Sequence, residues 1–247
     1  MVQHGKYRTL VKLGGLFGAL ALAVSPAVAA ECRLALVLAI DVSSSVDEAE
    51  DILQRGGLAS ALIATEVQAA VFAAPLPVAI AVYEWSGRYN QEILVDWTML
   101  NDQGDLLRVA ETIGRSKRSH NEFPTALGYA LGYGAGLFQR GPDCHFSVLD
   151  MAGDGENNEG FPPASAYAEF PFAGVTVNGL VVEASDYQAD ISLVEYYQKN
   201  VLYGPGSFLE VARGFDDYER AMRRKLEREL TPRAVGELQV APEAAPG

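Results

Sequence analysis

Residues 34–45 read LALVLAIDVSSS, an unbroken apolar run from Leu34 to Ile40 that ends abruptly at Asp41. A short apolar run without polar alternation is typical of a strand that is covered on both faces in a parallel sheet. Beyond the serines, apolar residues recur at helical spacing, and acidic and amide side chains take the other side of the helix. The expected apolar face is Ala49, Leu53, Gly56 and Ile63, and the expected polar face is Glu48, Glu50, Asp51 and Gln54. The stretch therefore predicts a strand, a polar loop and an amphipathic helix in succession.

The same alternation of strands and helices continues to about residue 230. Alternating elements of this kind indicate one doubly wound α/β domain, in which helices flank a mostly parallel central sheet in three α/β/α layers. We assign this domain to residues 31–230, and the Ala- and Pro-rich residues 231–247 to a loose tail. Further strands are predicted at residues 78–85, 92–97, 146–152, 175–182 and 208–211, and further helices at residues 105–113, 126–138, 163–170, 191–200 and 215–230.

The composition excludes several classes of protein. Of the 247 residues, 49% are hydrophobic and 21% are charged, which suits a globular domain and excludes a chain that is disordered throughout. Lysine and arginine number 19 against 32 acidic residues, giving a net charge of -13. No sequence-wide basic surface exists to neutralise a phosphate backbone, so we expect no nucleic-acid partner.

The first thirty residues have the pattern of a secretory signal peptide. Three basic side chains precede an apolar run at residues 16–24, and small residues precede Glu31. The run is shorter than the roughly 20 residues of a spanning helix, so we expect cleavage near Ala30 and no stable membrane insertion afterwards. Cleavage would leave 16 basic against 32 acidic residues, a net charge of -16. The chain is thus predicted to be exported, either to a periplasm or out of the cell.

Polar side chains follow two of the predicted strands and precede one of the predicted helices. Asp41, Ser43 and Ser45 stand at alternate positions, so an extended turn would point all three side chains toward one spot. Thr125 precedes the glycine-rich helix, and Asp154 stands between two glycines after a later buried strand. Ligands of open α/β sheets bind beyond the carboxyl ends of the strands, and oxygen-only donors select hard cations. The alternative is that Asp41 and Thr125 merely cap helices and Asp154 merely forms a turn.

The order D-x-S-x-S, then a lone threonine, then G-D-G, resembles the metal-ion-dependent adhesion site (MIDAS) of von Willebrand factor type A domains. The segments at residues 36–46, 82–87, 151–158 and 203–208 resemble an uncharacterised bacterial family of exported proteins built on that domain. The resemblance covers nearly all of residues 33–230. It implies five metal ligands, namely Asp41, Ser43 and Ser45 from the first loop, Thr125 from the second and Asp154 from the third.

The resemblance also implies what the metal ion does. Two carboxylates neutralise a divalent cation and three hydroxyls add no charge, so the ion stays electrophilic. In the domains that the chain resembles, an acidic side chain of a protein partner completes the shell around the ion. We expect Mg²⁺, with Mn²⁺ or Ca²⁺ as substitutes, because the site has few charged ligands and room for water. The predicted function is therefore metal-dependent protein binding without catalysis, to a partner that presents a carboxylate.

Three further residues near this edge of the sheet are less easily assigned. Asp150 lies inside a predicted strand, where a buried carboxylate needs partners. We expect it to belong to a structural hydrogen-bond network rather than to the outer shell of the metal site. Asn157 and Asn158 are candidates for the rim of the site, although solvated loop positions are the simpler expectation.

The two cysteines provide an independent check on the fold. Cys32 lies nine residues before Asp41, and Cys144 lies ten residues before Asp154. If both aspartates end neighbouring parallel strands, both cysteines begin them. A disulfide between Cys32 and Cys144 is then geometrically reasonable, and export would permit it.

Two other functions stay open at this point. A metal-dependent phosphoryl-transfer enzyme would use Asp41 as its nucleophile, but that class needs an acid two residues later, where this chain has Ser43. A metal-free structural interaction domain would use the loop hydroxyls only as helix caps. Turnover of a phosphate ester would favour the enzyme, and stability that is indifferent to Mg²⁺ and to a chelator would favour the metal-free domain.

Overall fold

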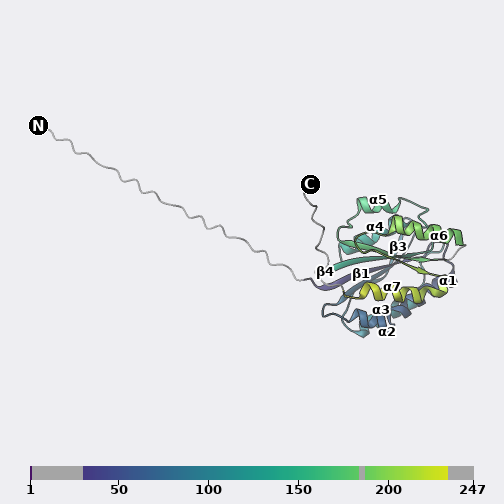
Figure 1. Cartoon of the computed structure of the whole chain (residues 1–247), viewed down its shortest axis with the longest axis horizontal. Coiled ribbons are helices and arrows are strands. Elements are labelled where there is room, and N and C mark those ends of the chain that lie inside the picture. Colours follow the sequence, from purple (N-terminus) through teal and green to yellow (C-terminus); the bar gives the residue numbers. More distant parts are fainter. Residues whose placement is uncertain (2–29, 184–186, 233–247) are drawn as a thin grey trace, which may run out of the picture.

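The computed structural model describes Met1 and residues 30–183 and 187–232. Its centre is a six-stranded sheet in the order β3-β2-β1-β4-β5-β6, in which only β3 is antiparallel to its neighbour. This order, with helices on both faces (Figure 1), confirms the predicted doubly wound α/β fold with a mostly parallel sheet. The strands are β1 (Cys32–Asp41), β2 (Val78–Ser86), β3 (Asn90–Leu100), β4 (Cys144–Gly153), β5 (Val175–Val182) and β6 (Leu209–Ala212).

The helices form the two outer layers of the domain (Figure 1). On one face, α1, α2, α3 and α7 pack against side chains that include Leu36 and Leu38 of β1. On the other face, α4, α5 and α6 pack against side chains that include Val37 and Ala39. Because successive residues of β1 enter opposite cores, all ten of its residues are buried. The helices are α1 (Glu48–Leu62), α2 (Thr65–Val71), α3 (Gln103–Arg115), α4 (Leu127–Phe138), α5 (Pro163–Glu169), α6 (Tyr187–Tyr196) and α7 (Tyr218–Leu230).

The parallel register brings the carboxyl ends of β1 and β4 to the same edge of the sheet. Ile40 of β1 pairs with Ala152 of β4, and Asp41 pairs with Trp85 of β2. The loops that follow β1 and β4 therefore start side by side in the middle of the sheet. Here the strand order changes direction, since β1 has β2 on one side and β4 on the other. Open α/β sheets bind ligands at such a switch point.

The buried face of α1 differs from the face that the sequence predicts. Leu53 and Ile63, from the predicted apolar face, are 40% and 41% exposed, whereas Asp51 is 5% exposed. The cause is Arg55, whose guanidinium is buried between Asp51 at 2.9 Å and Glu84 of β2 at 2.5 Å. Charges that are paired can be buried where a lone charge cannot, so the first half of α1 buries a polar face, whereas the second half buries the apolar Leu58, Ala61 and Leu62.

Short irregular elements account for the other differences from the prediction. The sequence does not predict α2, because its seven residues are too few to show a helical period. The helix predicted at residues 191–200 is α6 followed by a π-helical turn, Tyr197–Val201. The helix predicted at residues 215–230 begins as a 3-10 turn, Phe215–Asp217, before α7.

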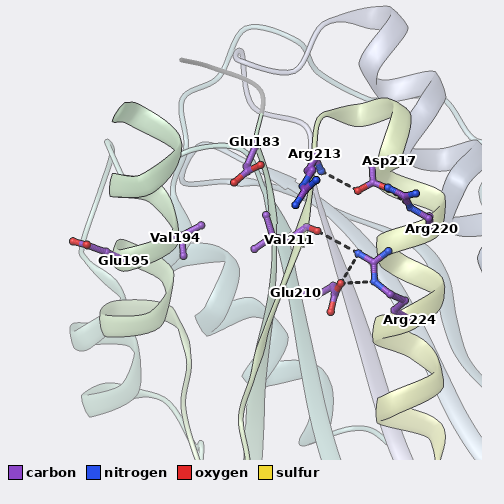
Figure 2. Close-up of a pocket in the computed structure, with 9 residues that line it drawn as sticks. All are labelled: Glu183, Val194, Glu195, Glu210, Val211, Arg213, Asp217, Arg220 and Arg224. Atoms are coloured by element: carbon purple, nitrogen blue, oxygen red, sulfur yellow. Dashed lines mark hydrogen bonds and ion pairs between the residues drawn. The ribbon is translucent and has the colours of Figure 1, made fainter. Parts of the chain in front are cut away.

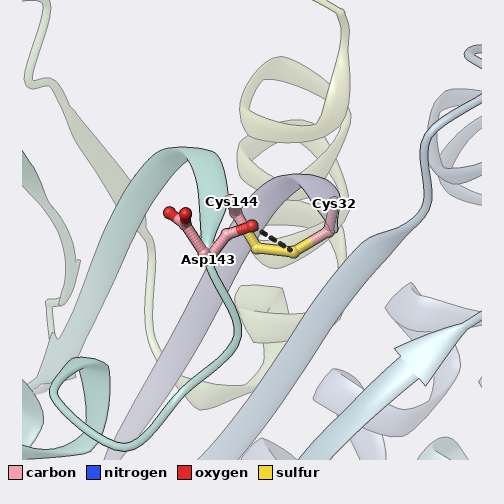
Figure 3. The surroundings of a disulfide bond; sticks show 3 residues. All are labelled: Cys32, Asp143 and Cys144. Carbon is pink, nitrogen blue, oxygen red and sulfur yellow. Dashed lines mark hydrogen bonds between the residues drawn. A yellow bond between two sulfur atoms is a disulfide. The ribbon is translucent and has the colours of Figure 1, made fainter. Parts of the chain in front are cut away.

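The structure confirms the predicted disulfide between Cys32 and Cys144 (Figure 3). The two residues are register partners at the first positions of β1 and β4, and their Cα atoms are 4.5 Å apart. That separation lies within the range that disulfides require. The bond therefore joins the amino-terminal ends of the two strands whose carboxyl ends lead to Asp41 and Asp154.

The described part of the chain, residues 30–183 and 187–232, contains no helix with the length and apolar character needed to cross a membrane. Residues 2–29 of the predicted signal peptide and residues 233–247 of the predicted tail lie outside the described residues. Both assignments therefore stay predictions.

Candidate metal centre

The loop after β1 folds around Asp41. This side chain is 1% exposed, and its Oδ1 accepts a hydrogen bond from the main-chain N–H of Ser43 at 2.8 Å. The turn that results places the hydroxyl of Ser43 3.1 Å from the hydroxyl of Ser45. The D-x-S-x-S spacing thus makes three oxygen-bearing side chains converge.

Thr125 and Asp154 join the same cluster from two other loops. Thr125 Oγ1 donates to Ser43 Oγ at 3.3 Å, and Ser45 Oγ donates to Asp154 Oδ1 at 2.7 Å. A hydroxyl can both donate and accept, so it can link two neighbouring oxygens. The structure therefore brings all five candidate side chains together, although Thr125 lies 82 residues from Ser43 and Asp154 lies 109 residues from Ser45 in the sequence.

The charges of the two carboxylates are disfavoured in the absence of a cation. The pKa of Asp41 is raised to about 8, first because of burial and second because of the charge of Asp154. The hydrogen bonds from Ser43 and the charge of Arg118 lower it in part. Burial also raises the pKa of Asp154, which the hydrogen bond from Ser45 opposes. A cation between the two carboxylates would stabilise both negative charges.

The donor atoms fit a hard divalent cation. Asp41 Oδ2 is buried without a hydrogen-bond partner among the described residues, so it is a free lone-pair donor inside the cluster. Two carboxylates and three hydroxyls offer only oxygen atoms, the donors that Mg²⁺ and Ca²⁺ prefer. Within residues 30–183 and 187–232, no group of three or more His, Cys, Asp and Glu side chains is placed to hold a metal ion. A cation bound at this cluster would therefore depend on the hydroxyls as well as on the carboxylates.

Asn157 and Asn158 hold the loop that carries Thr125. Asn158 Oδ1 accepts a hydrogen bond from the main-chain N–H of Thr125 at 2.9 Å. Asn157 Oδ1 accepts one from the main-chain N–H of Gly128, in the first turn of α4, at 3.2 Å. Each asparagine thus makes a specific contact that a merely solvated loop position does not require.

Asp150 lies in β4 but contacts a different part of the molecule. It is 1% exposed and forms an ion pair with Lys225 of α7 at 2.7 Å. This pair gives Asp150 the kind of structural partner that a buried carboxylate needs.

Two residues outside the motif hold the main chain of the loop after β1. Arg118 donates to the carbonyl oxygens of Val46 and Val42 at 2.6 and 2.9 Å. Gln54 of α1 donates to the carbonyl oxygen of Asp41 at 2.8 Å. Arg118 lies in the segment between α3 and α4, 76 residues from Val42. Neither motif spacing nor local periodicity could identify it.

A separate surface cleft of about 730 Å³ lies between α6 and α7, beside β6, and none of the five candidate residues lines it (Figure 2). Figure 2 shows Arg224 reaching from α7 to Glu210 of β6, with which it forms an ion pair at 2.5 Å. Arg220 forms a second ion pair with Asp217 at 2.6 Å. Because these charges neutralise one another, the cleft is a weaker candidate for a ligand site than the loops around Asp41.

One protein family and several solved structures match the chain. The family described as "Protein of unknown function (DUF1194)" matches residues 31–234. A search of curated proteins finds no significant match.

The solved structures share the fold over most of the chain. Proximal thread matrix protein 1 from the mussel byssus, with a zinc-occupied MIDAS motif, is 16% identical with a TM-score of 0.55, over 82% of this chain and 49% of that chain. A von Willebrand factor type A protein from Catenulispora acidiphila is 14% identical with a TM-score of 0.54, over 81% and 42%. The pilus adhesin SpaC from Lactobacillus rhamnosus GG is 14% identical with a TM-score of 0.59, over 81% and 31%. The chain thus spans about half of the mussel protein and less of the other two, and the likeness shows the von Willebrand factor type A fold.

Proposed function

Because the chain belongs to the DUF1194 family of proteins of unknown function and has the fold of a von Willebrand factor type A domain, we propose that it is an exported protein-binding module. It captures an acidic side chain of its partner through a divalent cation. One observation carries this proposal, the convergence of five oxygen-bearing side chains from three loops at one edge of the sheet. The proposed ligands are Asp41, Ser43, Ser45, Thr125 and Asp154.

The bound cation would supply an electrophilic point for a carboxylate from outside. Two carboxylates balance its charge, and the three hydroxyls add donors without adding charge, so the ion keeps its attraction for another anion. Asp41 is buried and Ser45 is exposed, so the partner would approach from the side of Ser45. Arg118 and Gln54 already order the main chain of this loop. The free-energy cost of ordering the loop when the partner binds is therefore smaller.

The similar structures support an interaction role and a divalent cation in general. The mussel byssus protein has a zinc-occupied MIDAS motif, and SpaC is a pilus adhesin. For this chain we propose Mg²⁺, with Mn²⁺ or Ca²⁺ as alternatives, because the candidate donors are all oxygens and include neither thiolate nor imidazole.

Two rival functions are distinguishable from this one. A phosphoryl-transfer enzyme with Asp41 as nucleophile needs a general acid nearby, and the position two residues on is Ser43, a buried hydroxyl that accepts a hydrogen bond from Thr125. A metal-free interaction domain would keep the hydroxyl network as it stands. The first rival predicts phosphate-ester hydrolysis that Asp41→Ala abolishes, and the second predicts stability that does not depend on cations.

Thermal unfolding in Mg²⁺, Mn²⁺, Ca²⁺ and EDTA tests the metal site. A cation that binds only the folded chain stabilises it by about 2.7 kcal/mol when present at 100 times its Kd. Asp41→Ala and Asp154→Ala should lose this effect. The matched control is Asp96→Asn, an exposed carboxylate on β3 that pairs with Arg140 at 2.7 Å, which should keep the effect. An unfolding midpoint of the wild type that is the same in EDTA and in every cation would contradict the proposal.

Net charge limits the kind of partner. The acidic chain would repel another acidic protein at long range, so we propose a partner that is neutral or basic overall and presents one exposed acid. Acetate is a minimal probe of that acid. Added to the Mn²⁺-loaded protein, it should displace water from the ion and lower the paramagnetic relaxation of bulk water, and an unchanged relaxation would contradict carboxylate capture.

Export is the part of the proposal that rests on sequence alone. Residues 1–30 have the charged, apolar and small-residue segments of a signal peptide. Expression of the full chain with a secretion-competent host should yield protein that begins at Glu31. Protein that retains Met1 and stays inside the cell would contradict export to either a periplasm or the medium.

A further inference from the structure

The π-helical turn after α6 places a tyrosine beneath the metal loops. Tyr197 is the first residue of this turn, Tyr197–Val201, and its side chain is fully buried. Its hydroxyl has no hydrogen-bond partner among the described residues. A buried hydroxyl without a partner costs stability, and π-helical turns occur frequently at functional sites. Packing of the ring explains why the side chain is buried but not why it carries a hydroxyl. Both observations therefore indicate that the hydroxyl has a function of its own.

The hydroxyl of Tyr197 and the carboxylate of Asp41 both lie close to Gly153. A Cβ atom added to Gly153 would lie 2.5 Å from Tyr197 Oη and 2.9 Å from Asp41 Oδ2. Asp41 Oδ2 is itself buried without a partner among the described residues. A donor and an acceptor, each without a partner among the described residues, therefore lie next to the small volume that the missing side chain of Gly153 leaves open.

The hydroxyl is available as a donor. A tyrosine hydroxyl has an ordinary pKa of about 10, so Tyr197 carries its proton at neutral pH. A carboxylate beside it is the natural acceptor once a cation stabilises the negative charge of Asp41. Hydrogen bonds of this kind, from groups behind the ligands, orient metal ligands in many sites.

We propose that Tyr197 is a positioning residue of the metal site, whose hydroxyl donates to Asp41 Oδ2 when a cation is bound and so orients that carboxylate. Gly153 is the residue that leaves room for this contact. The inference rests on the proposed metal site, and it adds to that site a residue from the π-helical turn that the D-x-S-x-S, Thr and G-D-G pattern does not contain.

Tyr197→Phe tests the inference, because it deletes one oxygen and keeps the packing of the ring. We expect the Kd for Mn²⁺, measured by calorimetric titration, to rise about 10-fold or more, as for other residues that orient metal ligands. In EDTA the unfolding midpoint should stay the same or rise, since the deleted hydroxyl has no partner without metal. A merely structural role would lower the midpoint in EDTA and leave the Kd unchanged.

Tyr218→Phe is the matched control. Tyr218 is also fully buried, and its hydroxyl likewise has no partner among the described residues, but it packs in the core on the other face of the sheet. The Kd of the Tyr218→Phe variant for Mn²⁺ should equal that of the wild type. Unchanged affinity in Tyr197→Phe, or an equal loss in both variants, would overturn the role of Tyr197 and leave the proposed metal site standing. A wild type that binds no Mn²⁺ would overturn both.

Discussion

Lys225 of α7 forms an ion pair with Asp150 of β4 at 2.7 Å, inside the hydrophobic core. Lys225 also forms an ion pair with Glu229, one turn further along α7, at 2.5 Å, and Asn178 of β5 donates to that carboxylate at 2.6 Å. Two buried carboxyl groups thus share one buried ammonium group. The helix α7 is thereby attached to the neighbouring strands β4 and β5, and Asp154 follows Asp150 of β4 by four residues.

The pKa of Asp150 makes the stability of the chain depend on pH. Burial above all raises this pKa from 3.8 to about 7, with the charge of Lys225 lowering it and that of Glu229 raising it. The folded chain therefore holds this proton more tightly than the unfolded chain does. The contribution of this proton to the free energy of unfolding is complete below about pH 4 and is lost as the pH rises to about 7.

Urea unfolding of the wild type and of Asp150→Asn at pH 4.5 and pH 7.5 measures this effect. The free energy of unfolding should fall with pH more steeply in the wild type, because the variant has no proton to lose at this position. All other titrating groups, Asp41 included, are common to both proteins. Their contributions cancel when the pH dependence of the variant's free energy of unfolding is subtracted from that of the wild type. Equal pH dependence in the two proteins would show that Asp150 does not titrate in this range.

Removal of the shared cation should destabilise the fold strongly. Lys225→Met keeps most of the side-chain volume but leaves the buried carboxyl groups of Asp150 and Glu229 without their ammonium partner. Breaking a buried ion pair in this way costs about 3–5 kcal/mol, to be measured by urea unfolding in EDTA. The control is Lys199→Met, an exposed lysine of the π-helical turn, which should change the free energy of unfolding by less than about 0.5 kcal/mol.

Local patterns in the sequence predict the strands, because each depends on neighbours within ten residues, whereas the five ligands of the motif are predicted by the resemblance to a MIDAS. The apolar run of β1 and the alternation of elements suffice for the fold, and the cysteine spacing suffices for the disulfide. The polar part of the buried face of α1 is different, since it follows from the pairing of Arg55 with Glu84, 29 residues away. The positions of Arg118 and Tyr197 near Asp41 likewise arise only when distant segments meet. Contacts of this kind leave no periodic signal in the sequence.

Arg118 should matter for metal binding without touching the metal. Arg118→Ala removes the donors to the carbonyl oxygens of Val42 and Val46, so the loop that carries Ser43 and Ser45 loses its anchor. The Kd for Mn²⁺ should rise about 10-fold, which is the lower end of the usual cost of losing a residue that supports metal ligands. Arg115→Ala is the control. The side chain of Arg115 is 80% exposed, and its ion pair with Glu111 is long, at 3.8 Å. Equal affinities in the two variants would show that the loop holds its shape without Arg118.

The disulfide should contribute to stability but not to metal binding. It closes a loop with a sequence separation of 112 residues, for which the chain-entropy model gives about 4 to 5 kcal/mol. The double variant Cys32→Ala, Cys144→Ala should lose up to that amount in urea unfolding. Its cation-induced rise in unfolding midpoint should persist, because the disulfide lies at the opposite ends of β1 and β4 from the metal loops. Loss of the cation effect in a folded double variant would contradict this separation of roles.

Two glycines of α4, eight residues apart, should respond to alanine in opposite ways. A Cβ on Gly128 would lie 2.0 Å from the carbonyl oxygen of Phe161, whereas Gly136 has no heavy atom within 4 Å of that position. Gly128→Ala should therefore destabilise the fold by about 1–3 kcal/mol through overpacking. It should also weaken Mn²⁺ binding, because the main chain of Gly128 is the donor that holds Asn157 beside the Thr125 loop. Gly136→Ala should stabilise the helix by about 0.5–1 kcal/mol, since alanine loses less backbone entropy on folding. Equal changes in urea unfolding would mean that the chain at Phe161 can move away from α4 at little cost.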